Sequence, residues 1–359
     1  MKIVQVQTQA EAGGAQHVSD MLGAGLRARG HDVRTVFMYR KTDAYDGDEH
    51  ADFVLDRRPS GPLDLLRSIV GLQGYMRRAR PDAVISFQHY GNIFGTIAAR
   101  LSGARHVIAN QSAAPGKFGG PLIALADRLF GRLGLYQYSV VNSAWTAEQF
   151  ADYPPAYRQR VRRIDHGVEI EPSRLNRQAA RATFGLPGDA YVMVSTGRLA
   201  AEKNQRVLVE ALADLPSAHL ALAGVGPEHD ALLALADGLG VSERLHLLGE
   251  IPRNRIGDVL ASGDVFVFAS RTETFGLSVA EAALAGLPVV ANDLPVLHEV
   301  LGDAAIYVDA DEPGQMAAAI RALISDPARA AALAEKGRAL GAKYSPAVMC
   351  RAYEELLAD

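Results

Sequence analysis

Hydrophobic and polar positions follow two patterns that alternate along this chain. Short apolar runs, typical of buried strands, are followed by longer segments with apolar residues three and four positions apart, typical of helices. This alternation predicts parallel sheets with helices on both faces. In the first half of the chain, strands are expected at residues 2–7, 33–39, 53–55, 83–87, 106–109 and 139–141.

The length of the chain predicts two domains. Its 359 residues, 48% of them hydrophobic, are enough for two cores. We expect a first domain at residues 1–165 and a second at 166–342, with a linker near 168–172, where a proline and mixed polarity break the periodicity. The alanine-rich stretch 316–342 predicts two helices, separated at Asp326–Pro327.

Two glutamates eight positions apart, Glu273 and Glu281, are the most informative residues. The apolar run 265–268 and the alanine-rich pattern 277–286 around them predict strand, loop and helix. Glu273 is then expected at the carboxyl end of the strand, and Glu281 about two turns along the helix. First-turn amides bind anions and carboxylates accept hydroxyl protons, so this segment suits a ligand that is part phosphate and part sugar. The alternative is that Glu273 is an acidic residue that interacts favourably with the helix dipole, and that Glu281 is a surface residue.

A second polar cluster follows the apolar run 191–195. Gly197 lets the chain turn after this strand, and residues 202–204 are expected to open a helix that reaches about residue 215. Arg198 and Lys203 then lie at the carboxyl end of the strand and in the first helical turn, where open α/β sheets bind ligands. The helix dipole repels cations there, so a bound anion explains the two side chains better than a solvated surface does.

The order of these motifs resembles glycosyltransferase family 4. The residues that carry the resemblance are Gly-Arg-Leu-x-x-Glu-Lys-Asn at 197–204, Gly-Val-Gly-Pro at 224–227, the segment from Glu273 to Glu281, and Gly-Leu-Pro-Val-Val-Ala at 286–291. The resemblance implies the GT-B architecture, an α/β fold in which two doubly wound, Rossmann-like parallel-sheet domains face each other across a cleft. It also implies that the last helix, within 343–359, packs back on the first domain.

The resemblance further implies a retaining transferase that moves a sugar from a nucleoside-diphosphate sugar to a hydroxyl acceptor. It assigns Arg198 and Lys203 to the donor diphosphate, Glu273 to the donor sugar and Glu281 to the ribose hydroxyls. The predicted catalytic residues are Arg198, Lys203 and Glu273. A UDP-sugar is the expected donor, with a GDP-sugar second, and no cofactor or metal is expected. The other predicted donor-binding residues are Gly13, Gly14, Gly197, Glu202, Gly226, Thr274, Phe275, Gly276, Leu277 and Ser278.

The acceptor side of the first domain is less defined. Many relatives have a histidine after the strand that here spans 106–109, whereas this chain has Asn110 and Gln111. These two residues and His89 are the candidate acceptor contacts. Gly13 and Gly14 follow the first strand without the third glycine of a dinucleotide fingerprint, which disfavours a nicotinamide-dependent oxidoreductase.

Charge is divided unevenly along the chain. Residues 1–170 hold 21 Lys and Arg against 16 Asp and Glu, and the remainder holds 16 against 25, which gives the net charge of −4. A basic first domain suits a lipid-linked acceptor or an acidic membrane surface, whereas nucleic acid is not expected. The helical pattern 122–133, with Lys117, Arg128 and Arg132 around it, either lies on a bilayer or packs on the sheet.

Location and biological role are expected to follow from these features. A single cysteine, Cys350, and the lack of a long apolar run predict a cytoplasmic protein, peripheral at most on the inner face of the plasma membrane. The expected acceptor is lipid-linked or a growing surface polysaccharide. Two alternatives remain open: a nucleotide-sugar epimerase of the same architecture, and a non-catalytic nucleotide-sugar-binding protein.

Overall fold

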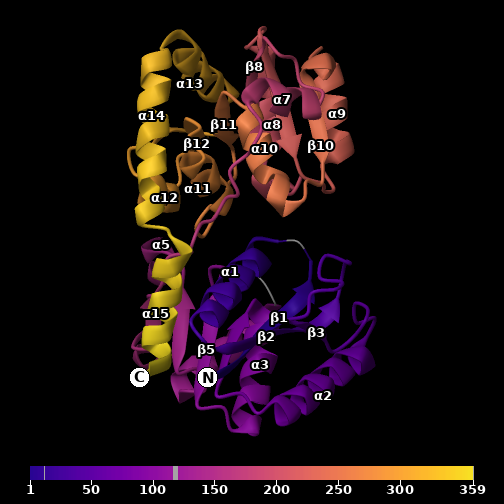
Figure 1. Ribbon diagram of the computed structural model, residues 1–359, viewed down its shortest axis with the longest axis vertical. Helices are drawn as coiled ribbons and strands as arrows, with labels where there is room; N and C mark the ends of the chain where they lie inside the picture. Colours follow the sequence, from indigo (N-terminus) through magenta and orange to yellow (C-terminus); the bar gives the residue numbers. More distant parts are fainter. Residues whose placement is uncertain (12, 116–119, 359) are drawn as a thin grey trace. The chain divides into compact units, whose positions relative to one another are not determined.

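The computed structural model describes residues 1–11, 13–115 and 120–358, which form two compact α/β units (Figure 1). Unit 1 comprises Met1–Gly167 and the C-terminal segment from Tyr344 onward, and unit 2 comprises Val168–Lys343. Each unit is built on a parallel sheet, which confirms the predicted fold class. The division between Gly167 and Val168 falls at the start of the segment expected to be a linker.

The sheet of unit 1 has seven parallel strands in the order β3-β2-β1-β4-β5-β6-β7. Its register is set by buried pairs such as Val4 with Val84 on the neighbouring strand. The chain progresses in opposite directions from β1 and from β4, so the carboxyl ends of these two strands mark the switch point of the sheet. The strands are β1 (Lys2–Ala10), β2 (Asp32–Arg40), β3 (Ala51–Phe53), β4 (Ala83–Phe87), β5 (His106–Gln111), β6 (Tyr138–Val141) and β7 (Val161–Arg163).

Helices cover both faces of this sheet. On one face, Val4 and Val6 pack with Leu72 and Ala98, which belong to α2 and α3. On the other face, α1 and α15 lie together, and Arg29 after α1 pairs with Glu354 at 2.9 Å. The helices of unit 1 are α1 (Gly14–Ala28), α2 (Pro62–Ala79), α3 (His89–Ser102), α4 (Gly120–Leu133), α5 (Ala144–Glu148), α6 (Pro155–Arg158) and α15 (Pro346–Ala358).

The sheet of unit 2 has six parallel strands in the order β10-β9-β8-β11-β12-β13, so its switch point lies between β8 and β11. Val207, Leu220 and Val267 belong to one buried cluster that joins helix α8 to the strands. The strands are β8 (Tyr191–Thr196), β9 (Ala218–Ala223), β10 (Leu245–Gly249), β11 (Val265–Phe268), β12 (Val289–Asn292) and β13 (Ala305–Val308).

The helices of unit 2 include the pair predicted for the alanine-rich stretch. They meet at Asp326, whose carboxylate accepts a 3.0 Å hydrogen bond from the Arg329 amide and caps α14. The helices are α7 (Arg177–Thr183), α8 (Gln205–Ala213), α9 (His229–Gly238), α10 (Ile256–Ser262), α11 (Leu277–Leu284), α12 (Pro295–Leu301), α13 (Pro313–Ser325) and α14 (Pro327–Ala339), with 3-10 turns η1 (Ala201–Lys203), η2 (Ser242–Arg244), η3 (Arg253–Arg255) and η4 (Leu340–Ala342).

Three local expectations were wrong. The helix expected from residue 202 begins only at Gln205 (α8), because residues 201–203 form a 3-10 turn and Asn204 adopts a left-handed conformation (φ 52°) between the two. The strand expected at 53–55 lies two residues earlier. Strand β7 was missed because two of its three residues are exposed arginines, as is common on an edge strand.

Candidate functional site

The predicted donor residues of unit 2 gather at the carboxyl ends of β8 and β11. These strands are hydrogen-bonded neighbours, with Val194 opposite Phe266. Because the strands are parallel, the loops that follow them leave the sheet at the same edge. The two loops therefore meet at the switch point, the position where open α/β sheets bind ligands.

Glycines allow the loops after β8 and β9 to pass very close to each other. Gly197 and Gly224 have φ values of 148° and 145°, which side chains rarely adopt. A Cβ atom on Gly224 would lie 2.0 Å from the Gly197 carbonyl oxygen, and one on Gly226 would lie 2.1 Å from that of Leu199. The contact is closed by a 3.0 Å hydrogen bond from the Leu199 amide to the Val225 carbonyl. Gly226, expected to bind donor, thus has a packing reason to be glycine.

Lys203 and Glu273, seventy positions apart, form an ion pair. The Lys203 ammonium lies 2.5 Å from a Glu273 carboxylate oxygen, and both side chains are mostly buried. The backbone holds them together, because the Glu202 carbonyl accepts a 2.9 Å hydrogen bond from the Arg271 amide. A cation and a carboxylate are thereby fixed side by side at the switch point, one suited to a phosphate oxygen and the other to a sugar hydroxyl.

Arg198 lies at the same edge but is more exposed. Its guanidinium pairs with Glu202. A hydrogen bond from its own backbone amide, and then the hydrogen bond and charge of Arg198, lower the pKa of Glu202, so this carboxylate is ionised at neutral pH. Arg198 and Glu202, both predicted to bind the donor, therefore lie together in the loop after β8.

Helix α11 begins directly after Glu273, Thr274 and Phe275. Gly276 caps it in a left-handed conformation (φ 84°), and a Cβ atom there would lie 2.8 Å from Leu297. Phe275 is buried and anchors the turn. Leu277 and Ser278 form the first helical turn, whose amides cannot find acceptors within the helix and are suited to an anion.

Glu281 lies four residues after the first residue of α11, about one helical turn rather than the expected two. The alternative that Glu281 is a surface residue was wrong, because it is only 4% exposed. Burial raises the pKa of its carboxyl, and the neighbouring Arg253 guanidinium opposes that rise. Arg253 donates a hydrogen bond of 2.5 Å to Glu281.

Arg253 is a site residue that the sequence analysis missed. It lies in the turn η3, which follows β10 after Pro252. The signal that selected Arg198, a cation just after the carboxyl end of a strand, applies equally to Arg253. Its pairing with a glutamate twenty-eight positions later has no local signature.

The acceptor-side candidates of unit 1 separate into two places. His89, the first residue of α3, and Gln111, the last of β5, line a small pocket with Asp127 of α4. Burial lowers the pKa of His89, which favours the neutral imidazole. Asn110 is not brought into this pocket, because its amide donates to the Tyr353 hydroxyl of α15 on the other face of the sheet.

Asp127 is a half-buried carboxylate that links α4 to this pocket. It accepts hydrogen bonds from Gln111 at 2.8 Å, Tyr136 at 3.0 Å and Tyr157 at 3.1 Å. Burial raises the pKa of Asp127, and these donors oppose the rise. The network fixes the orientation of the Gln111 amide at the carboxyl end of β5.

The two predicted glycines of unit 1 lie where helix α1 begins. Gly13 is its N-terminal cap and Gly14 its first residue. The amide of His17 donates a 2.9 Å hydrogen bond to the Gly13 carbonyl, which closes the first turn of this helix. This places both glycines at the carboxyl end of β1, next to the switch point of the unit 1 sheet.

Two family models match the chain, one for each half. Glycosyltransferase Family 4 matches residues 12–172, and Glycosyl transferases group 1 matches residues 176–340. The chain belongs to glycosyltransferase family 4.

Named relatives of this family member support the assignment. D-inositol 3-phosphate glycosyltransferase 1 of Catenulispora acidiphila is 35% identical over 240 residues, which cover 62% of this chain and 55% of that protein. The GDP-mannose-dependent alpha-(1-6)-phosphatidylinositol monomannoside mannosyltransferase of Mycolicibacterium smegmatis is 31% identical over 259 residues, 67% and 66% of the two chains. The chain thus spans little more than half the length of the first of these relatives.

Solved structures share the fold of this family member. The crystal structure of Anabaena Alr3699/HepE in complex with UDP and glucose covers 100% of both chains with a TM-score of 0.87 and 20% identity. At this level of identity the likeness concerns the fold, and it confirms the predicted GT-B architecture.

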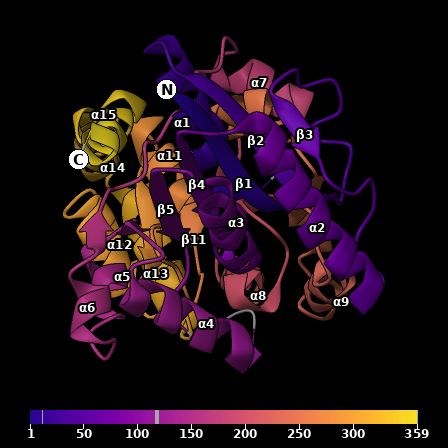
Figure 2. The ribbon, with the colours of Figure 1, turned by 90° about the horizontal axis from the view of Figure 1, so that it is seen from below.

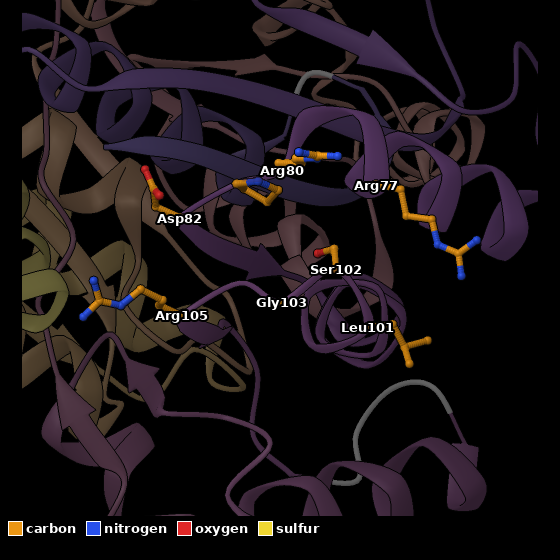
Figure 3. A pocket seen from close by; sticks show the side chains of 8 residues that line it. Arg77, Arg80, Asp82, Leu101, Ser102, Gly103 and Arg105 are labelled. Carbon is orange, nitrogen blue, oxygen red and sulfur yellow. The ribbon is translucent and has the colours of Figure 1, made fainter.

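The protein also has an open pocket of about 580 Å³ at the amino ends of the strands of the unit 1 sheet. Figure 3 shows Arg77 and Leu101 on one side of it and Arg105 on the other. Asp82 precedes β4 and Arg105 precedes β5, so the pocket lies at the amino ends of these strands, away from His89 and Gln111. It is a basic surface feature, separate from the candidate acceptor contacts.

Proposed function

We propose that this protein is a retaining glycosyltransferase that moves a sugar from a nucleoside-diphosphate sugar to a hydroxyl acceptor, with a UDP-sugar favoured over a GDP-sugar. The observation that carries the proposal is the Lys203–Glu273 pair at the unit 2 switch point, directly before α11. Support comes from Anabaena HepE, whose structure holds UDP and glucose, while the M. smegmatis relative is named as GDP-mannose-dependent.

The proposed reaction uses the charges at this edge. Arg198, Lys203 and the first-turn amides of α11 hold the diphosphate and stabilise the negative charge that builds on the departing nucleoside diphosphate. Glu273 accepts hydrogen bonds from the donor sugar, and Glu281 from the ribose. The bond from the anomeric carbon to the phosphate oxygen breaks, and a bond from that carbon to the acceptor oxygen forms on the same face. The proton of the acceptor hydroxyl passes to the departing phosphate oxygen.

This arrangement supplies the stabilising charge from side chains and amides, so the proposal includes no metal and no cofactor. The ion pair also orients the site before donor binds. Lys203 and Glu273 already hold each other in place, so little side-chain freedom is lost when phosphate and sugar hydroxyls approach them.

The nucleotide is the first point to test. In a thermal-shift series, UDP and UDP-sugars should raise the melting temperature by several degrees, because a ligand at a hundredfold excess over its Kd adds about 2.7 kcal/mol of stability. GDP should have a smaller effect, and the UDP shift should be unchanged in EDTA. A shift that EDTA removes and Mg²⁺ restores would contradict the metal-free proposal. The absence of a shift with every nucleoside diphosphate would contradict donor binding itself.

We further propose a lipid-linked or surface-polysaccharide acceptor, met at the acidic inner face of the plasma membrane. No helix within the described ranges has the length and apolarity needed to cross a bilayer. The proposal instead rests on α4, where Leu122, Leu125, Leu129 and Leu133 are 79%, 63%, 45% and 64% exposed.

The two sides of α4 differ in the way an interfacial helix requires. Its inner side carries Asp127, bonded to the sheet through Gln111, while its outer side presents the leucines next to Arg128 and Arg132. The helix therefore packs on the unit and still offers an apolar stripe flanked by cations, which suits an acidic bilayer surface. Lys117, the third expected cation, lies outside the described residues.

Vesicle flotation tests this membrane contact. The protein should float with vesicles that contain phosphatidylglycerol and much less with phosphatidylcholine alone. Replacing Leu122, Leu125 and Leu129 by serine should reduce flotation more than about tenfold, since each exposed leucine contributes about 1 kcal/mol or more when it enters the interface. The same change at Leu63 and Leu66, which are exposed on α2, is the matched control. Equal flotation of the α4 variant and the unchanged protein would contradict the proposal.

A further inference from the structure

One neighbour, Arg253, favours the ionised form of Glu281. Its side chain is 5% exposed, and burial of a carboxylate without a partner favours the protonated form. Within the part of the chain that the structure describes, the Arg253 guanidinium is the charged group that acts on it, by a hydrogen bond and by charge. Among other charges near α11, Lys203 pairs with Glu273, and Arg338 of α14 lies against Gly286 beyond the helix end.

Arg253 is itself held in place by a second contact. The same nitrogen that reaches Glu281 donates a 2.8 Å hydrogen bond to the Glu169 carbonyl, at the start of unit 2. The guanidinium is thus fixed between a backbone oxygen and the carboxylate. Its side chain is 40% exposed, so it is also open to solvent on its outer side.

The protonation state of Glu281 decides what it can bind. An ionised carboxylate accepts hydrogen bonds from two hydroxyl groups, whereas a protonated one offers a donor and fewer acceptor positions. A ribose presents two neighbouring hydroxyls that can both donate, and the ionised form accepts from both, so it fits the role proposed for Glu281 best. The partner that keeps Glu281 ionised therefore controls nucleotide affinity.

We propose that Arg253 is a positioning residue for the nucleotide site. Its guanidinium holds Glu281 ionised and oriented toward the ribose. The inference rests on the proposed donor site and adds to it a residue outside the family motifs found in the sequence. Arg253 acts through Glu281 and is not expected to touch the reacting atoms.

The experiment measures the Kd of UDP by calorimetry for the full chain and three variants. Arg253→Gln removes the charge and should weaken UDP binding roughly 10- to 100-fold at neutral pH, because charged hydrogen bonds to buried groups are among the strongest. Arg253→Lys keeps a cation and should recover part of the loss. Arg255→Gln is the matched control, since Arg255 lies in the same turn, is 42% exposed and pairs with Asp258 at 3.2 Å, away from Glu281.

The pH dependence separates positioning from a general structural loss. Without Arg253 the pKa of Glu281 rises further, so UDP affinity should fall at a higher pH in Arg253→Gln than in the unchanged protein. The difference between the two proteins should shrink on the alkaline side, where both carboxylates are ionised. A pH-independent loss of affinity would indicate structural damage and overturn the inference.

Other outcomes are equally distinct. If the unchanged protein binds no nucleoside diphosphate, the proposed function fails. If it binds UDP and Arg253→Gln binds UDP equally well or more tightly, only the role of Arg253 fails.

Discussion

Replacement of Lys203 by alanine is expected to lower kcat/KM for sugar transfer about 1000-fold. The ammonium is the cation fixed beside Glu273 at the switch point, and it is proposed to neutralise charge that builds on the departing diphosphate. Loss of one such preorganised group typically costs about 100- to 1000-fold, and the variant also leaves the mostly buried Glu273 without its partner. Steady-state transfer from a UDP-sugar to a glycan acceptor measures the effect.

A surface lysine provides the matched control for this variant. Lys336 pairs with Asp303 at 2.6 Å in the same unit but away from β8 and β11, so Lys336→Ala should retain normal transfer. Circular dichroism of both variants checks that they fold. Near-normal turnover of Lys203→Ala would refute the diphosphate role. Incubation with donor alone completes the series, because an epimer formed without acceptor would identify an epimerase instead.

Replacement of Glu281 by glutamine is expected to raise the KM for the donor about 100-fold, with a smaller effect on kcat. Glutamine keeps the shape of the side chain inside α11 but loses the charge and one acceptor position for the ribose. It also removes the ion pair with Arg253, so a loss of about 1–3 kcal/mol in stability is expected from the uncompensated guanidinium, reduced by its partial exposure.

The Glu281→Gln change should also alter how donor affinity depends on pH. Because burial raises the pKa of Glu281, donor affinity of the unchanged protein should weaken as the pH falls through that raised value. Glu281→Gln has no titrating group there and should lack this dependence. Glu210→Gln is the control, since Glu210 lies on α8 and pairs with the exposed Arg206 at 2.8 Å. A Glu281→Gln variant with unchanged KM would exclude the ribose contact.

The sequence by itself determined the architecture of both units. Periodicity is a local property, so the alternation of strand and helix patterns was sufficient to predict two parallel sheets and the paired helices that meet at Asp326. The positions of Arg198, Lys203 and Glu273 just after predicted strands also indicated a common site, because the carboxyl ends of neighbouring parallel strands lie at the same end of a sheet.

Only the tertiary structure decided which charges face each other and which apolar residues are left outside. The local pattern left open the alternative that Glu281 is a surface residue, and the structure shows that α11 buries it against Arg253 from a turn twenty-eight positions earlier. The leucines of α4 have the period of a packed helix, but Asp127 fixes the opposite side of that helix to the sheet and leaves them exposed. Both outcomes depend on contacts between distant segments, and these form through the packing of whole elements, which no short window of sequence records.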